Sequence, residues 1–184
     1  MREVILAKSA GFCFGVNRAV ELVEKAAGEG KNVVTLGPII HNRHVVARFR
    51  DLGVSVIDRP EDAAPGTTVV IRSHGVSRDI YRRLEQRGVE IVDATCPFVK
   101  RIHKLVSAAE DLGRQPVIIG TRSHPEVQAI AGWCSCPIVF ETPEEVDNWV
   151  HSASFSRDLP VTLVCQTTST QKLWENCKKI IKKE

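Results

Sequence analysis

Short, unbroken runs of β-branched and aliphatic residues recur along this 184-residue chain, and they constrain its fold more than any other feature. The runs lie at residues 4–7, 33–36, 69–71, 117–119 and 161–164, and a further short strand is expected at residues 90–92. Runs of this kind are typical of strands that are buried on both faces of a parallel sheet. Amphipathic stretches at residues 16–27, 77–87, 98–112 and 170–183 predict helices between them. The alternation predicts an α/β fold with mostly parallel strands.

A weak internal repeat indicates two similar lobes. Residues 70–74 and 120–124 both end in Arg-Ser-His, and in each case an apolar strand precedes the triplet and a helix follows it. We therefore expect two α/β lobes, each a mostly parallel sheet flanked by helices. Proline suits the first position of a helix, so Pro97 places the boundary near Cys96. The first lobe would span residues 1–96 and the second would begin at residue 97.

Composition narrows the class of function. A formal net charge of +3 and an aromatic content of 5% do not suggest nucleic-acid binding. No apolar run approaches the ~20 residues that cross a bilayer, and no export signal is recognisable at the start of the chain. We therefore expect a cytoplasmic protein that binds no membrane. In that compartment the six cysteines are better interpreted as metal ligands or catalytic groups than as disulfides.

Reactive side chains follow the predicted strands at the point where each strand ends. Ligands of open parallel sheets bind beyond the carboxyl ends of the strands, so these side chains should meet in one crevice. The set comprises Cys13, His41, His74, Cys96, His124, Glu126, Thr167 and Thr168. We therefore predict a single functional site that draws on both lobes.

Cys13 and Cys96 are the candidate metal ligands, because each lies directly before a predicted helix. A helix N-terminus stabilises the thiolate, and the small or apolar neighbours of both cysteines suit an iron–sulfur cluster. The alternative for each is a small buried apolar residue. Only one residue separates Cys134 from Cys136, which is a weak metal signal, and we interpret both as structural. Cys165 belongs to a predicted strand and is expected in the core.

The three histidines are candidates for binding an anion. Each of His41, His74 and His124 could instead be a core residue or a helix cap. Together with helix N-terminal amides, three imidazolium donors suit a diphosphate, and the hydroxyls of Thr167 and Thr168 can add neutral donors. The chain lacks the glycine-rich P-loop motif, which argues against a P-loop nucleotide site.

Glu126 lies two residues after His124 and is the candidate proton donor. A carboxylic acid in that place could relay a proton to a bound ligand. Equally, a glutamate in the first turn of a helix could serve only to stabilise the helix dipole.

These residues lie in motifs that together resemble those of the 4-hydroxy-3-methylbut-2-enyl diphosphate reductase family, also called IspH or LytB. The motifs occupy residues 10–16, 37–42, 72–76, 93–99, 123–127 and 166–169. They follow the order of the family and cover essentially the whole chain.

The resemblance implies the activity and the roles of the site residues. It implies a [4Fe–4S] cluster held by three cysteines, of which Cys13 and Cys96 match two. It assigns the substrate's diphosphate to the three histidines, proton donation to Glu126, and orientation of the substrate or a water to one of the two threonines. The implied reaction uses two electrons and protons to remove an allylic hydroxyl as water, which gives isopentenyl and dimethylallyl diphosphates. The implied electron donor is a ferredoxin or a flavodoxin.

The family continues into a third α/β lobe that carries the third cluster cysteine, and this chain stops before that lobe. Residues 97–184 would then hold the second lobe and the start of the connection to the third. We therefore expect a truncated chain that is inactive alone. Two alternatives remain open: a non-catalytic remnant that binds diphosphate or another anion, and a zinc-binding α/β protein that uses Cys13, Cys96 and a histidine.

Overall fold

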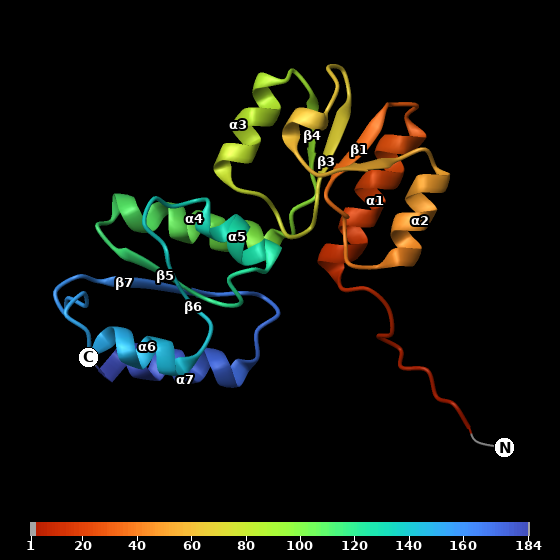
Figure 1. Ribbon diagram of the computed structural model, residues 1–184. Coiled ribbons are helices and arrows are strands. Elements are labelled where there is room, and N and C mark those ends of the chain that lie inside the picture. Colours follow the sequence, from red (N-terminus) through yellow and green to blue (C-terminus); the bar gives the residue numbers. More distant parts are fainter. Residues whose placement is uncertain (1–2, 184) are drawn as a thin grey trace.

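The computed structural model describes residues 3–183 and contains two parallel sheets, each flanked by helices (Figure 1). The strand order is β2-β1-β3-β4 in the first sheet and β6-β5-β7 in the second. Every strand pair within these residues is parallel, which confirms the predicted α/β fold class. None of the helices in this range is long and apolar enough to cross a membrane.

The first sheet has a fully buried centre. Its strands are β1 (Val33–Leu36), β2 (Ser55–Ile57), β3 (Thr68–Ile71) and β4 (Glu90–Asp93). The accompanying helices are α1 (Phe14–Gly28), α2 (Arg43–Asp51), the short 3-10 helix η1 (Pro60–Asp62) and α3 (Arg78–Gln86). Every residue of β1 and β3 is buried, because α1 and α2 pack on one face of the sheet and α3 packs on the other.

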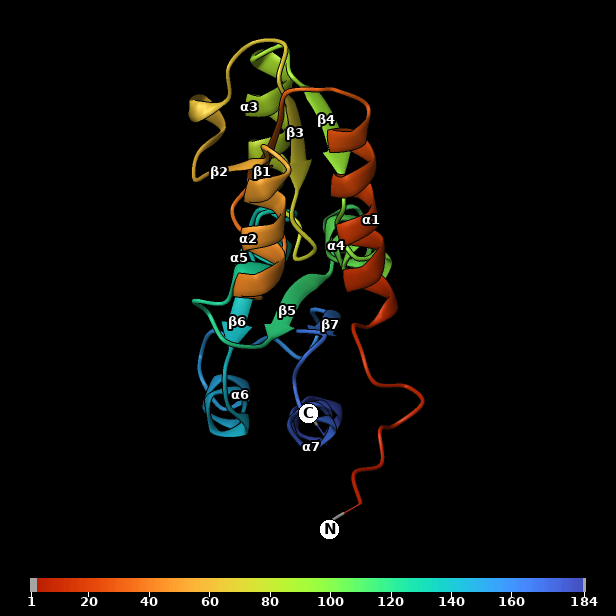
Figure 2. The same cartoon turned by 90° about the vertical axis from the view of Figure 1, so that its right-hand side faces the viewer.

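The second sheet has the same three-layer arrangement. Its strands are β5 (Gln115–Ile119), β6 (Ile138–Phe140) and β7 (Val161–Cys165). Its helices are α4 (Pro97–Asp111), α5 (Pro125–Ala131), α6 (Pro143–Val150) and α7 (Gln171–Lys183). Helices α4 and α5 pack on the face towards the first sheet, whereas α6 and α7 cover the far face (Figure 2). Strand β4 belongs to the first sheet, whereas α4 packs on the second. Cys96 lies between these two elements, and the lobe boundary near it stays a prediction.

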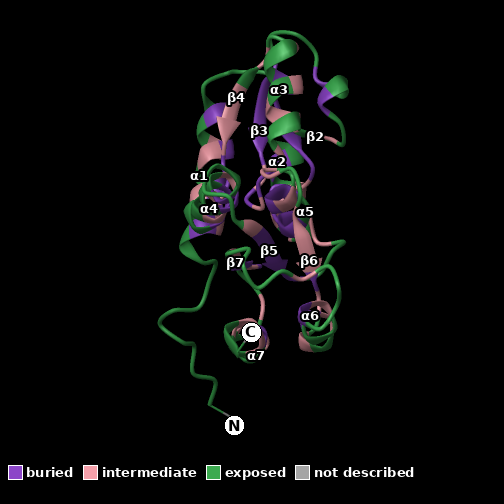
Figure 3. Cartoon of the chain, turned by 90° about the vertical axis from the view of Figure 1, so that its left-hand side faces the viewer, coloured by how far each residue is buried: buried purple, intermediate pink, exposed green. Residues whose placement is uncertain are grey.

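The strand predicted at residues 4–7 is absent, and that prediction is wrong. The segment before α1 is irregular and extends away from the sheets, as Figure 3 shows. The exposed fractions of Val4, Ile5 and Leu6 are 90%, 84% and 81%. A strand needs a neighbour to accept and donate its backbone hydrogen bonds, and no strand within residues 3–183 pairs with this segment. Cys13 therefore precedes α1 without following a strand.

The elements that were not predicted from the sequence include β2, α2 and α6. Strand β2 has only three residues and lies at the edge of its sheet, so it lacks the apolar run of a central strand. Helix α2 begins where the Asn42 side chain accepts hydrogen bonds from His44 and Val45. Helix α6 begins with Pro143 after the capping residue Thr142. Both helices are therefore specified more by their N-terminal caps than by a long amphipathic stripe.

The two sheets are held together through the contact between the start of α3 and helices α4 and α5. The Trp133 indole donates a hydrogen bond of 2.9 Å to the Val76 carbonyl and stacks on His103, with 5.0 Å between the ring centroids. Gly132 lies against Ser77, and a Cβ at Gly132 would clash with the Ser77 Cβ. Because no larger residue fits at this contact, the approach of the two parts depends on this glycine.

Candidate functional site

Three histidines from separate loops meet between the two sheets. His41 follows β1, His74 follows β3, and His124 follows β5 and caps the N-terminus of α5. The ring centroids of His41 and His74 are 5.0 Å apart, and those of His74 and His124 are 5.4 Å apart. The structure therefore brings together the three imidazoles that the sequence placed after strands. His41 and His74 follow strands of the first sheet, which end at the same edge, and His124 approaches them from the second sheet.

Ser73 joins the loops that carry these side chains. Its backbone N–H and its hydroxyl both donate to the Ile39 carbonyl, at 3.2 and 3.1 Å. Its own carbonyl accepts a 2.9 Å hydrogen bond from the backbone N–H of Cys96. The Ser73 side chain is buried, so these bonds are protected from water. They fix the loops of His41, His74 and Cys96 relative to one another.

His74 lies at the centre of the histidine cluster. Burial, together with the nearby His41, His124 and Arg72, lowers the pKa of His74 to about 4. Its Nδ1 atom is buried and has no hydrogen-bond partner within residues 3–183. His74 is therefore neutral at neutral pH and has a ring nitrogen that a ligand could satisfy.

His124 has a defined tautomer. Its Nδ1 accepts a 3.1 Å hydrogen bond from the backbone N–H of Glu126, which is the capping bond of α5. In the neutral ring, the proton is therefore on Nε2, which remains available as a donor. Charging this imidazole would place a proton on Nδ1 and break the cap. His124 is consequently suited to donate to an anion as a neutral imidazole.

Glu126 is buried, with 2% of its surface exposed, and it contacts the loop after β7. One carboxylate oxygen accepts a 2.6 Å bond from the backbone N–H of Thr167, and the other accepts a 2.8 Å bond from the Thr167 hydroxyl. Of the two candidate threonines, Thr167 is thus the one in contact with the carboxylate. Glu126 is more than a first-turn residue that stabilises a helix dipole, because its side chain joins two loops.

Gln166 is a residue of this region that was not singled out from the sequence. Its side-chain oxygen accepts from the backbone N–H of Thr121 at 3.1 Å, and its nitrogen donates to the Thr168 hydroxyl at 2.7 Å. A Cβ at Gly120 would lie 2.8 Å from the Cβ of Gln166, so the two loops are in close contact. The available signal was its position: Gln166 directly follows β7, as the histidines follow their strands.

Cys13 and Cys96 occupy equivalent places, each at the N-cap of a helix, α1 and α4 respectively. Cys13 is exposed and Cys96 is half-buried. A Cβ at Gly15 would lie 2.6 Å from the Cys96 sulfur, so the first turn of α1 rests against this second cysteine. Two thiols at helix N-termini suit two ligands of an iron–sulfur cluster. No group of three His, Cys, Asp or Glu with metal-binding geometry occurs within residues 3–183.

Cys134, Cys165 and Cys177 are less suited to binding metal. Burial raises the pKa of Cys134 and of Cys177 to about 11, and it raises the pKa of Cys165. These thiols stay protonated at neutral pH, whereas a metal ligand is the thiolate. Cys177, on α7, is fully buried in the core that this helix forms with α6 and the second sheet. Cys134 packs in the core between the second sheet and helices α4 and α5, as expected for a structural residue.

The fold and these contacts define a two-lobed α/β protein whose histidines, buried glutamate and helix-capping cysteines lie near the junction of two parallel sheets. The family model described as LytB protein matches residues 4–184, and the chain belongs to this family.

Two relatives of this chain carry the same name. The chain is 39% identical over 188 residues to a 4-hydroxy-3-methylbut-2-enyl diphosphate reductase of Caldanaerobacter subterraneus, with 98% of this chain and 62% of that protein covered. It is 37% identical to the reductase of that name from Clostridioides difficile, covering 94% of this chain and 61% of that protein.

Two solved structures agree in fold. One, a (E)-4-hydroxy-3-methyl-but-2-enyl diphosphate reductase described as the terminal enzyme of the non-mevalonate pathway, superposes with a TM-score of 0.80 at 37% identity. The superposition covers 100% of this chain and 63% of that protein. The other, a diphosphate reductase from Plasmodium falciparum, gives a TM-score of 0.88 at 25% identity, covering 96% of this chain and 55% of that one. The chain thus spans less than two-thirds of the length of these relatives.

Proposed function

We propose that this chain forms part of a 4-hydroxy-3-methylbut-2-enyl diphosphate reductase, an oxidoreductase of the non-mevalonate isoprenoid pathway. The reaction removes the allylic hydroxyl: two electrons and two protons replace the C–O bond by a C–H bond and release water. The products are isopentenyl and dimethylallyl diphosphates. The observation that supports this proposal best is the meeting of three imidazoles close to the end of α5 that carries Glu126, in a chain that shares the family's motifs.

The histidines are proposed to bind the diphosphate. His124 offers a neutral Nε2–H, and His74 has an unpartnered buried Nδ1 that can become a donor when an anion is bound. Charge-assisted donors to phosphate oxygens are shorter and stronger than neutral ones, so a bound anion favours the protonated form of His74. His41, beside His74, supplies the third ring.

Glu126 is proposed to hold the proton that reaches the substrate, and Thr167 is proposed to orient the substrate or a water. The carboxyl group is buried and keeps its position because Thr167 donates to both of its oxygens. A buried carboxylic acid held in one position is an efficient general acid, because little reorganisation precedes proton transfer. Gln166 positions the neighbouring Thr168 hydroxyl and keeps the loop after β7 in contact with the loop after β5.

Cys13 and Cys96 are the proposed thiolate ligands of a [4Fe–4S] cluster, and their places at two helix N-termini fit that role. When bound, such a cluster supplies the electrons and an open iron for the substrate's hydroxyl. The third family cysteine has no counterpart among the cysteines of this chain, and we propose that the chain alone has little or no activity. A ferredoxin or flavodoxin as electron donor fits the cytoplasmic location expected from the sequence.

The proposal is tested by calorimetric titration of the purified chain with inorganic diphosphate. We expect binding in the wild type and at least ~10-fold weaker binding in the His41→Ala/His74→Ala variant, because each good charge-assisted bond contributes about 1.5–3 kcal/mol. Glu126→Gln serves as the control, since it keeps the shape of the side chain and should bind diphosphate as the wild type does. Equal affinities in the wild type and the double histidine variant would contradict the proposal.

A second measurement separates an enzyme from an anion-binding remnant. After anaerobic reconstitution with iron and sulfide, dithionite-driven turnover of the allylic diphosphate is compared for the wild type and Glu126→Gln. Any turnover by the wild type should be lost in Glu126→Gln. Diphosphate binding without detectable iron would favour the non-catalytic alternative, and stoichiometric zinc would favour the zinc-binding one.

A further inference from the structure

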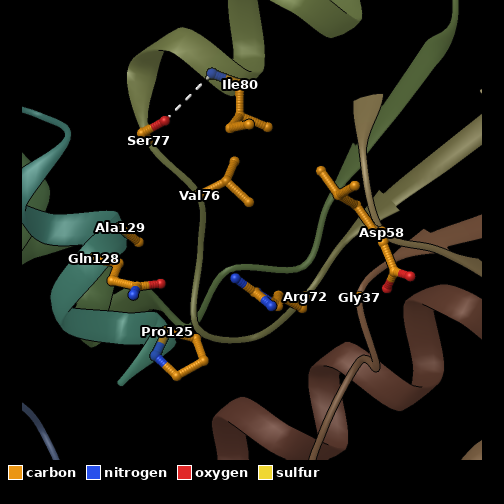
Figure 4. Close-up of a pocket in the computed structure, with 10 residues that line it drawn as sticks. Gly37, Asp58, Arg72, Val76, Ser77, Ile80, Pro125, Gln128 and Ala129 are labelled. Carbon is orange, nitrogen blue, oxygen red and sulfur yellow. Dashed lines mark hydrogen bonds between the residues drawn. The ribbon is translucent and has the colours of Figure 1, made fainter. Parts of the chain in front are cut away.

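A cavity of about 230 Å³ lies between the first sheet and α5, and none of the three clustered histidines lines it. Figure 4 shows how its walls come from distant parts of the chain. Gly37, Asp58 and Arg72, from the ends of three strands of the first sheet, form one side. Helix α3 with the loop before it contributes Val76 and Ile80, and α5 contributes Pro125 and Gln128. A ligand in this cavity would therefore touch elements that pack on both sheets.

The positive charge in this cavity comes from Arg72, whose guanidinium lies between Pro125 and Asp58 (Figure 4). Its side chain makes no hydrogen bond or ion pair with any residue between 3 and 183, and its Nε atom is buried. Burial lowers the pKa of Arg72, yet a guanidinium stays protonated in proteins. A partly buried cation without a partner is costly, and a bound anion would remove that cost.

Gly37, the residue after β1, leaves room for the Arg72 side chain. Gly37 has a φ of +69°, and a Cβ added there would lie 2.8 Å from the Arg72 Nη1 atom. Any larger residue would therefore strain the backbone and push the guanidinium away from the end of β1. The arginine and the glycine together keep the head group in the cavity.

The two Arg-Ser-His triplets differ in how the charge of their arginine is balanced. Arg122 has the same place as Arg72 in the second Arg-Ser-His triplet. Its guanidinium donates to the Glu145 carboxylate at 2.6 Å and lies 3.5 Å from that of Glu141. Among residues 3–183, Arg72 has no such partner: Asp58 is the only carboxylate of this range that lines the cavity, and it forms no ion pair with Arg72. The second copy of the triplet is neutralised by the protein, and the first is not.

We propose that this cavity is a second anion site, which binds a small organic molecule through an oxyanion group paired with Arg72. The Gln128 amide provides a further donor at the side of the cavity, and Val76, Ile80 and Pro125 pack against a short apolar part of the ligand. The volume is below the 300–1,000 Å³ typical of sites for drug-sized ligands, which limits the ligand to a small molecule. A phosphate monoester and a carboxylate share the required chemistry.

The test uses n-butyl phosphate and pentanoate as probes, titrated into the full chain by calorimetry. We expect one of them to bind, with the affinity at least ~10-fold lower in Arg72→Gln and intermediate in Arg72→Lys, because a bidentate guanidinium is replaced by a point charge. The probe that binds tells whether the site takes a phosphate or a carboxylate. The His41→Ala/His74→Ala variant should still bind the probe, because neither imidazole lines the cavity, and this separates the site from the proposed diphosphate site.

A second variant keeps the test independent of any folding defect in Arg72→Gln. Gln128→Glu introduces a carboxylate next to Arg72 with almost no change in shape, as Glu145 does beside Arg122. We expect this internal counter-ion to weaken probe binding at least ~10-fold and to raise the melting temperature. Thermal unfolding of each variant checks that it is folded. Probe affinities equal to the wild type in both Arg72→Gln and Gln128→Glu, or lost only in the double histidine variant, would overturn the proposal.

Discussion

Thr167 donates both its backbone N–H and its hydroxyl to the buried carboxylate of Glu126, at 2.6 and 2.8 Å. The two residues are 41 positions apart, but they follow adjacent strands, because β5 and β7 pair in parallel with Ile119 opposite Cys165. This contact connects the candidate proton donor to the neighbouring loop, so it should matter for stability as well as for chemistry.

Replacing the Thr167 hydroxyl should destabilise the protein. Thr167→Val leaves one buried carboxylate oxygen without its donor, and we expect a loss of about 1–3 kcal/mol in the free energy of unfolding, measured by urea denaturation. Thr167→Ser keeps the hydroxyl and should lose much less. Thr168→Val is the matched control, since it leaves both bonds to Glu126 intact. A Thr167→Val variant as stable as Thr167→Ser would show that the hydroxyl bond contributes nothing.

Diphosphate binding should be coupled to proton uptake by His74. The pKa of His74 is about 4 in the free chain, and a bound anion raises it. Between the free and the bound pKa, binding takes up a proton, so the affinity falls as the pH rises. Calorimetry at pH 5.5 to 8 in buffers of different ionisation enthalpy measures this uptake. His74→Gln corrects for titration of the ligand, and equal proton uptake in this variant and the wild type would contradict the prediction.

Stability should fall as the medium becomes acidic. The pKa values of His74 and His103 are lowered by burial to about 4, from an ordinary value of 6.5. Between these limits the unfolded chain binds more protons than the folded one, so stability is present above pH 6.5 and is lost as the pH falls towards 4. The slope should reach about 1.4 kcal/mol per pH unit for each histidine.

The His103→Phe variant isolates the contribution of His103 to the pH dependence of stability. A phenyl ring can keep the stacking on Trp133 and cannot be protonated, so the pH slope of unfolding should drop by about one proton. His44→Gln removes an exposed imidazole instead and tests whether the slope depends merely on the number of histidines. An unchanged slope in His103→Phe would assign the acid sensitivity to other groups.

Gly15 should be required for the arrangement of the two cysteines. In Gly15→Ala the new methyl group would lie 2.6 Å from the Cys96 sulfur, so α1 must move or the cysteine must turn. We expect a destabilisation of about 1–3 kcal/mol, as for other overpacked sites, and less iron bound after reconstitution. Gly28→Ala, at the other end of α1 with nothing within 4 Å, is the matched control and should be neutral or stabilising. Equal iron content in both variants would argue against a shared cysteine site.

The chain alone should hold no stable cluster. Clusters of this type are anchored by cysteine thiolates, and two thiolates leave two irons dependent on solvent or added thiols. We therefore expect iron and sulfide to be lost on desalting after anaerobic reconstitution, and faster in Cys13→Ser than in the wild type. A four-iron cluster that survives desalting would show that ligands other than these two cysteines suffice.

Several parts of this architecture could be read from the sequence. The runs that form β1, β3 and β5 are apolar on both faces, and strands of that kind have few places other than the centre of a parallel sheet. The run at residues 4–7 has the same character and forms no strand, because pairing depends on a neighbour that the local sequence does not specify. Edge strand β2 is the opposite case. It has no long apolar run of its own, and it forms a strand by pairing with β1.

The sequence by itself determined which residues would be available at the strand ends, since a side chain that follows a buried parallel strand emerges at one edge of the sheet. Only the tertiary structure decided what each of them meets. Glu126 meets Thr167 and not Thr168, and the Arg-Ser-His triplet places Arg122 against glutamates but leaves Arg72 facing a cavity. The physical reason is that local sequence sets backbone propensity and burial, whereas hydrogen-bond and charge partners come from segments that are distant along the chain.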